Sequence, residues 1–210
     1  MAGVKGPLFS LDASGSIGDA IVFAKWKGRN YVRRHAIPAN PKSVGQVSVR
    51  VMMKFLTQYW QSLSDAEQAD WETRAAATDI SPFNAFVGYN AERWGRYAFP
   101  SKEDPAGEAN TAGTILAPTA TAGSRSILLA VPISALDENW GVVIHADLET
   151  GFTPSRNTAV QIIPAESVAT FSWLDFPLTV GVEVFYRFES FSDDGVNDLL
   201  VGEQSATPTA

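Results

Sequence analysis

The sequence predicts an α+β N-terminal module, made of a β-hairpin and three helices, followed by an all-β sandwich. Three observations lead to this fold class. Apolar residues between 44 and 97 recur at steps of three and four, whereas beyond residue 113 they alternate with polar residues. A run rich in proline, glycine and charge separates the two patterns. Because 45% of the 210 residues are hydrophobic, the chain has enough apolar surface to bury a core.

The first 40 residues have the pattern of β-structure. A short apolar run, 20–24, is separated from the segment 31–35 by residues 27–30, which contain Gly28. This arrangement indicates a hairpin with its turn near that glycine. Two prolines within the next few residues end the β part, because proline cannot donate to a strand ladder or continue a helix.

Three helices are expected after these prolines. One apolar face at helical spacing indicates the first, and it consists of Val44, Val47, Val51, Met52, Phe55, Tyr59 and Leu63. Ser64 and Glu67 have the spacing of a capping box, so a second helix begins there and runs to about Ala77. Ser81 followed by Pro82 is typical of a third helix start, because serine caps the first turn and proline fits its first position.

The expected organisation has three parts. Residues 1–99 form the hairpin and helical docking module, 100–112 have the composition of a linker, and 113–210 form the sandwich. In the last part, short strands separated by turn residues are expected near 126–132, 140–148, 158–163, 168–174, 182–190 and 200–207.

The charges of the two halves are opposed. Residues 1–100 carry 12 Lys and Arg against 8 Asp and Glu, a net charge of +4, whereas residues 101–210 carry 4 against 15, a net charge of −11. This asymmetry predicts two modules with different neighbours. The acidic half would repel nucleic acid and anionic membranes, and the basic half could dock on a negative surface.

The residues that most catalytic and metal chemistry needs are scarce. The chain has no cysteine and two histidines, His35 and His145, which excludes thiolate catalysis, Cys-ligated zinc and multi-histidine metal sites. We therefore expect no catalytic residue, no metal ligand and no cofactor, and hence no enzyme. No apolar run approaches the roughly 18 residues of a membrane span, and the first residues lack the apolar core of a signal peptide.

Two local patterns resemble functional sites, one a catalytic pair and the other a calcium loop. His145 and Asp147 lie two residues apart on one expected strand, but no marked nucleophile or oxyanion group accompanies them, so His145 is interpreted as a half-buried strand residue. The run 193–198 superficially resembles a calcium loop. Its glycine stands third and the closing glutamate is missing, so a strand-connecting turn is expected there.

The basic hairpin is the candidate docking surface. It consists of Lys25, Trp26, Lys27, Arg29, Tyr31, Arg33 and Arg34. Cations interleaved with aromatics can grip a nucleic-acid backbone and stack on bases. The same pattern describes a hairpin that docks on an acidic protein surface, or an edge strand protected by its charges. We favour the protein-docking or solvated interpretation.

An ordered set of motifs covers residues 1–97. They are the glycine turn 15–18, the Lys-Gly-Arg strand 27–33, the Pro-x-Asn-Pro run 38–41, the paired tryptophans Trp60 and Trp71, and the Ser-Pro-Phe helix start at 81–83. This order resembles a family of small proteins encoded in tailed phages and prophages, many of them among virion structural genes.

The resemblance implies a structural component of the virion, made in the host cytoplasm, that serves as an accessory or decoration protein of head, neck or tail. Its partners would be other virion proteins and further copies of itself, in a homo-oligomer or a many-copy lattice.

Residues 113–210 are similar to a fibronectin type III or related immunoglobulin-like domain. The similarity rests on Leu178–Gly181 before the expected strand at 182–188, and on the turn 192–195 after it. It implies an exposed module that could contact a host surface, and a carbohydrate-adhesion module is an open alternative.

A rival resemblance, of 60–71 to an HMG box, implies DNA bending. Residues 64–79 carry one cation against five acids, so nucleic acid is disfavoured as a partner.

Overall fold

The computed structural model describes residues 3–4, 13–18, 20–36, 42–107, 109–134, 139–165, 170–199 and 202–210. The chain divides into two compact units, Met1–Pro41 and Lys42–Ala210. The opposed charges follow this boundary. The first unit has 6 Lys and Arg against 2 Asp and Glu, a net charge of +4, and the second has 10 against 21, a net charge of −11.

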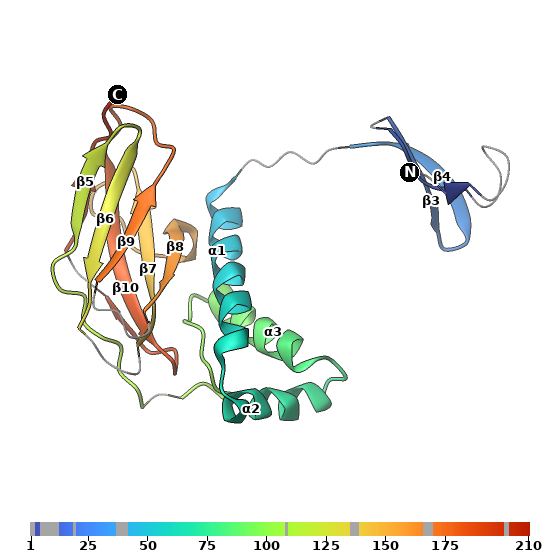
Figure 1. Cartoon of the computed structure of the whole chain (residues 1–210), viewed down its shortest axis with the longest axis horizontal. Coiled ribbons are helices and arrows are strands. Elements are labelled where there is room, and N and C mark those ends of the chain that lie inside the picture. The colour runs from blue at the N-terminus through green and yellow to red at the C-terminus, as the bar shows by residue number, and fades with distance from the viewer. Residues whose placement is uncertain are drawn as a thin grey trace. The chain divides into compact units, whose positions relative to one another are not determined.

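The first unit contains a four-stranded antiparallel sheet (Figure 1). Its strands, in spatial order, are β1 (Gly3–Val4), β2 (Ala13–Ile17), β3 (Ile21–Trp26) and β4 (Arg29–Arg34). Lys27 and Gly28 join β3 to β4 with φ angles of 47° and 80°. Positive φ at both central residues is the geometry that matches the right-handed twist of a hairpin. The expected hairpin and its turn are therefore confirmed, while β2 lies partly where the sequence indicated a turn.

The second unit begins with three helices, as expected. They are α1 (Val44–Tyr59), α2 (Asp65–Ala76) and α3 (Pro82–Gly95), with a short 3₁₀ turn η1 (Trp60–Ser62) after the first. The expected caps are present: Glu67 Oε2 accepts from the Ser64 amide at 2.6 Å, and Ser81 Oγ accepts from the Asn84 amide at 3.2 Å. Among the described residues, no helix has the length and apolar character that crossing a membrane requires.

Two antiparallel sheets follow and form a β-sandwich (Figure 1). One has the order β5 (Thr119–Gly123), β6 (Ser126–Pro132) and β9 (Thr170–Asp175). The other has the order β11 (Asn197–Leu199), β10 (Val184–Ser192), β7 (Asn139–Asp147) and β8 (Ala159–Pro164), with β12 (Gln204–Ala206) also paired to β10 and the 3₁₀ turn η2 (Arg156–Thr158) before β8. The strands expected between 126 and 190 are confirmed. The strands β5 and β11 were not expected. Of the strand expected at 200–207, residues 200–201 lie outside the described residues, and β12 covers three of the others.

Apolar side chains of both sheets fill the sandwich interior. Ile127, Leu129, Val142, Ile144 and Phe188 are all fully buried in this core. The two sheets are also joined by a hydrogen bond, which the Tyr186 hydroxyl on β10 donates to Asp175 on β9 at 2.9 Å. This interior follows the alternation that the sequence showed.

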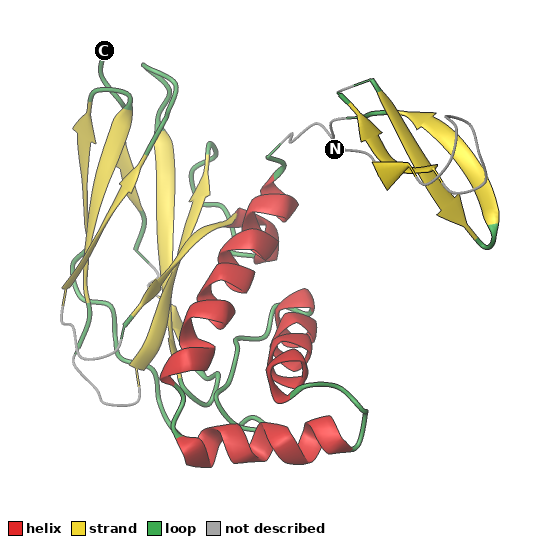
Figure 2. Ribbon diagram, turned by 45° about the vertical axis from the view of Figure 1, so that its right-hand side comes forward, coloured by secondary structure: helices red, strands yellow, loops and turns green. Residues whose placement is uncertain are grey.

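The outer face of the β7–β10 pair is covered by the helices (Figure 2). Val143 and Phe191 project from this face into a second core, together with Phe55, Phe86 and Trp71 of the helices. β7 is consequently buried over seven successive residues, the pattern of a strand covered on both faces.

A β-bulge places Trp140 in this second core. The pairing of β7 with β10 steps from Gly141–Phe191 to Asn139–Ser192, so Trp140 is an extra residue. Without the bulge, Trp140 would share the face of Val142 and point into the sandwich interior. It instead meets Phe55 edge-on, with ring centroids 5.0 Å apart.

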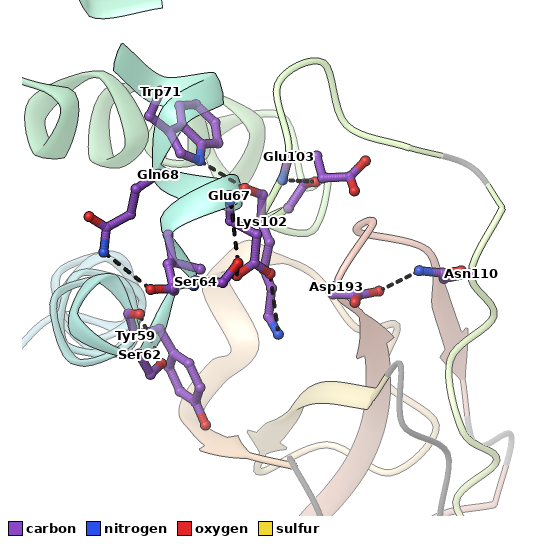
Figure 3. A network of polar contacts seen from close by, with 12 residues as sticks. Tyr59, Ser62, Ser64, Glu67, Gln68, Trp71, Lys102, Glu103, Asn110 and Asp193 are labelled. Carbon is purple, nitrogen blue, oxygen red and sulfur yellow. Dashed lines mark hydrogen bonds and ion pairs between the residues drawn. The ribbon is translucent and has the colours of Figure 1, made fainter. Parts of the chain in front are cut away.

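Residues 100–107 and 109–112 are held against both the helices and the sheet (Figure 3). Trp71 Nε1 donates to the Lys102 carbonyl at 2.8 Å, and Asn90 exchanges two hydrogen bonds with the Ser101 backbone at 3.0 and 2.8 Å. Asp194, in the β10–β11 turn, accepts from the amides of Ala109 and Asn110 at 3.1 and 2.9 Å. The expected linker is thus a packed strap, and the helices share one compact unit with the sandwich. The division of the chain falls at Pro41 instead, after the two prolines.

Position 141 is predicted not to tolerate even one added methyl group in place of the glycine. Its Cβ would overlap the ring of Phe191, which lies directly across the ladder. We expect Gly141→Ala to lower the free energy of unfolding by about 1–3 kcal/mol, the usual cost of overpacking, as measured by urea denaturation.

The matched control is Gly88→Ala, because Gly88 is an exposed residue inside α3 with open space at its Cβ. This variant should be neutral or more stable by up to about 1 kcal/mol. Equal effects of the two substitutions would contradict the proposed packing of Phe191 on Gly141.

Candidate docking surface

The seven expected docking residues lie on β3, β4 and the turn between them. The register pairs Trp26 with Arg29, Ala24 with Tyr31, and Val22 with Arg33. Directly paired residues project to the same side of a sheet. One face therefore carries Trp26, Arg29, Tyr31 and Arg33.

The other two strand cations lie on the opposite face. Lys25 is paired with Asn30, and Arg34 with Ile21. Lys27 stands in the turn, where its Nζ lies 4.8 Å from the centre of the Trp26 ring. The sequence grouped all seven residues into one surface, whereas the structure brings four together on one face and adds Lys27 at its end. Whether this surface binds a partner stays a prediction.

The face with the aromatics is open to solvent. The Trp26 side chain is 65% exposed and that of Tyr31 is 43% exposed. Together with Arg29 they line a shallow depression. Large exposed aromatics beside arginines are the composition of interface hot spots, so this face, which we call the aromatic face, is the stronger part of the candidate surface.

Few apolar side chains are buried in the described part of this unit. Within the described part of residues 15–36, Phe23 is the one large apolar side chain that is buried, at 5% exposure. Ile17, Ile21 and Val32 lie beside it and are 39–49% exposed. The sequence did not single out this second, apolar face, because its residues read simply as strand residues.

A buried polar cluster lies in the second unit, between the sheet and the end of α3. The ring of His145, which is fully buried, contacts Thr158 through Nδ1 at 2.9 Å and Glu189 through Nε2 at 3.0 Å. The Tyr97 hydroxyl donates to the same Glu189 carboxylate. Burial raises the pKa of Tyr97 far above its ordinary value of 10.0, and the hydrogen bond and charge of Glu189 add to the shift.

Neither pattern that imitated a site in the sequence forms one in the folded chain. His145 is fully buried rather than half-buried, and Asp147 accepts from the amides of Leu148 and Glu149 instead of approaching it. Residues 193–196 form the expected turn between β10 and β11, and the last two residues of the run, Asn197 and Asp198, already belong to β11. Within the described ranges, no three His, Cys, Asp or Glu side chains come together as they would to hold a metal ion.

Comparison with known proteins gives limited matches. No protein-family model matches the chain, and no curated protein does. Among solved structures, a β-1,2-glucanase from Parabacteroides distasonis is similar over 48% of this chain and 14% of its own, with 14% identity and a TM-score of 0.34. An Fn3-like protein from Clostridium thermocellum is similar over 48% of this chain and 97% of its own, with 16% identity and a TM-score of 0.31.

These matches correct one expectation. The sequence analysis excluded an enzyme, but the first of these structures is an enzyme, so the exclusion is contradicted and we withdraw it. The chain spans a small part of that glucanase, and similarity at this level assigns no activity. The resemblance of residues 1–97 to a phage family has no counterpart in either of these two structures.

Tyr97 is predicted to make the second unit sensitive to alkaline pH. Its pKa is higher in the folded chain than in the unfolded one, so its contribution to stability is complete below about pH 10 and is lost as the pH rises further. We expect the free energy of unfolding to begin to fall near pH 10, the ordinary pKa of tyrosine, and to go on falling as the pH rises further. Tyr97→Phe should be less stable at pH 7 by about 1–2 kcal/mol and should show a shallower alkaline loss.

Tyr31→Phe is the control, because this exposed tyrosine belongs to the first unit. Urea titrations that follow the second unit by its tryptophan fluorescence would measure both variants. Parallel alkaline curves for the wild type and Tyr97→Phe would contradict the assigned role of the Tyr97–Glu189 bond.

Proposed function

We propose that this chain is a structural component of a tailed-phage virion, in which the first unit anchors the chain and the sandwich is presented outward. The observation that carries the proposal is the aromatic face, where Trp26 and Tyr31 are exposed beside two arginines on a sheet with one buried large side chain among its described residues. Such a sheet gains apolar burial chiefly from a partner. The ordered motifs of residues 1–97 supply the phage context.

The strand order supports a fibronectin type III subtype for the sandwich. Three strands, β5, β6 and β9, face a sheet in which β8, β7, β10 and the C-terminal strands follow one another. This is the arrangement expected of an immunoglobulin-related sandwich with an added strand beside the central pair. On the outer face of the β5–β6–β9 sheet, Leu128 is paired with Leu174, and both are about half exposed. Exposed apolar side chains of this kind suit a module that touches a host surface.

The charges support the proposed orientation. The anchoring unit carries +4, and the helices together with the sandwich carry −11. Exposed acidic modules repel one another on a particle surface and repel packaged DNA. The proposed partners are therefore other virion proteins with acidic surfaces and further copies of the chain in a many-copy arrangement.

Purified particles of the phage or induced prophage that encodes the chain would test the role. Mass spectrometry should detect the chain at a constant number of copies per particle, and electron microscopy with a tagged copy should place it at the head, neck or tail. If the chain is absent from purified particles, the proposal fails.

The aromatic face should determine incorporation into the particle. Trp26→Ala combined with Tyr31→Ala is expected to lower the copy number at least about tenfold, because aromatic hot-spot residues carry most of an interface's binding energy. The matched variant, Lys25→Ala with Arg34→Ala, removes two cations from the opposite face and should have a smaller effect. An equal loss in both variants would contradict a docking surface confined to the aromatic face.

Single-stranded nucleic acid is the second candidate partner of the same face. Two exposed aromatic rings beside arginines also form a stacking platform. This function predicts affinity for an oligonucleotide that falls steeply with salt concentration. Fluorescence anisotropy with a labelled oligothymidine would measure it, and no binding at low salt would remove this candidate.

A further inference from the structure

Three arginines surround one hollow in the second unit, far along the chain from the candidate docking surface. The hollow has a volume of about 260 Å³ and is lined by Arg74, Tyr89, Glu92, Arg93, Arg96 and Ala98. The lining thus holds three cations and one carboxylate. Positive charges brought this close repel one another, and carboxylates pair with two of the three.

Two of the arginines are fixed in place on the Tyr89 ring. The guanidinium carbons of Arg74 and Arg93 lie 4.5 and 5.8 Å from the ring centre. Arg74 Nη1 also donates to both oxygens of Asp104 at 2.8 and 2.9 Å, and Arg93 Nε donates to the Phe99 carbonyl at 2.7 Å. The Tyr89 hydroxyl in turn accepts from the Ala106 amide at 3.1 Å. Groups held in this way lose little entropy when a ligand binds.

The charge of Arg93 is not neutralised by a carboxylate within the described part of the chain. Arg93 donates to a carbonyl oxygen, lies over an aromatic ring and reaches Gly195 in the β10–β11 turn, whereas Arg74 is paired with Asp104 and Arg96 with Glu92. The pair of Arg96 and Glu92 has side chains 77% and 61% exposed. Such a surface pair contributes little stability, so Arg96 can turn to a ligand at small cost.

We propose that this hollow binds an oxyanion, the carboxylate or phosphate group of a ligand, with Arg93 as its main contact and Arg96 as a second. Guanidinium groups bind both kinds of oxyanion through charge-assisted hydrogen bonds. The Tyr89 ring forms an apolar floor beside them. The site is independent of the proposed virion role, because its residues belong to the second unit alone.

Titration calorimetry on the full-length chain at low salt would test the site with two probes, a tetraglutamate peptide and inorganic phosphate. Binding of either probe supports the proposal, and which one binds more tightly identifies the source of the oxyanion. Arg93→Gln should weaken binding at least about tenfold, and Arg96→Gln about threefold. Glu92→Gln should tighten binding a few fold, because it removes the competing carboxylate.

Lys54→Ala is the matched control, since it removes one exposed cation from α1, outside the hollow, and it should leave the affinity unchanged. If Arg93→Gln does not fold, the opposite effects of Arg96→Gln and Glu92→Gln, at mostly exposed side chains, still decide the question. The proposal is overturned if neither probe binds the wild type, or if Lys54→Ala weakens binding as much as the substitutions in the hollow.

Discussion

The aromatic layer between the helices and the β7–β10 pair holds the second unit together. Phe55, Trp140 and Phe191 form a triangle of edge contacts, with ring centroids 5.0 to 6.0 Å apart. Each of these side chains is at most 2% exposed. A helix layer that detached would bring a fully buried Trp140 and Phe191 into water, at a cost of several kcal/mol. The helices and the sandwich therefore fold as one unit.

The same layer determines where polar groups are buried. Because the helices exclude water from the outer face of the sheet, Glu189 on that face needs partners, and it finds them in Tyr97, His145 and Asn197. Backbone groups of the strap likewise form hydrogen bonds with Asn90, Trp71 and Asp194. Removing any one of these side chains leaves a buried partner unsatisfied, which makes the covered face sensitive to polar as well as apolar substitutions.

Local signals in the sequence predicted the elements, and long-range contacts decided the rest. Ser64 with Glu67 and Ser81 with Pro82 mark helix starts through interactions within one turn, so sequence alone could find them. The strap reads as a linker because its contacts come from Trp71 and Asp194, which are 31 and 85 residues away from their partners. The direction in which the Trp140 side chain projects depends on a β-bulge, which no local sequence pattern indicates. For the docking residues, composition found the hairpin, and only the register showed which side chains share a face.

The low apolar burial among the described residues of the first unit, together with the unit's charge, leads to one constraint on its partner. β4 lies at the edge of its sheet and carries three arginines in six exposed residues. Pairing with β4 of another copy would bring arginines close to arginines, and like charges that face one another destabilise a ladder. Edge cations are a common protection against self-association. A partner that offers carboxylates would instead gain from the same residues, and by binding only the folded sheet it would stabilise that sheet. The arginines of β4 therefore make the proposed anchor selective in two ways. They repel β4 of another copy, and they attract acidic surfaces.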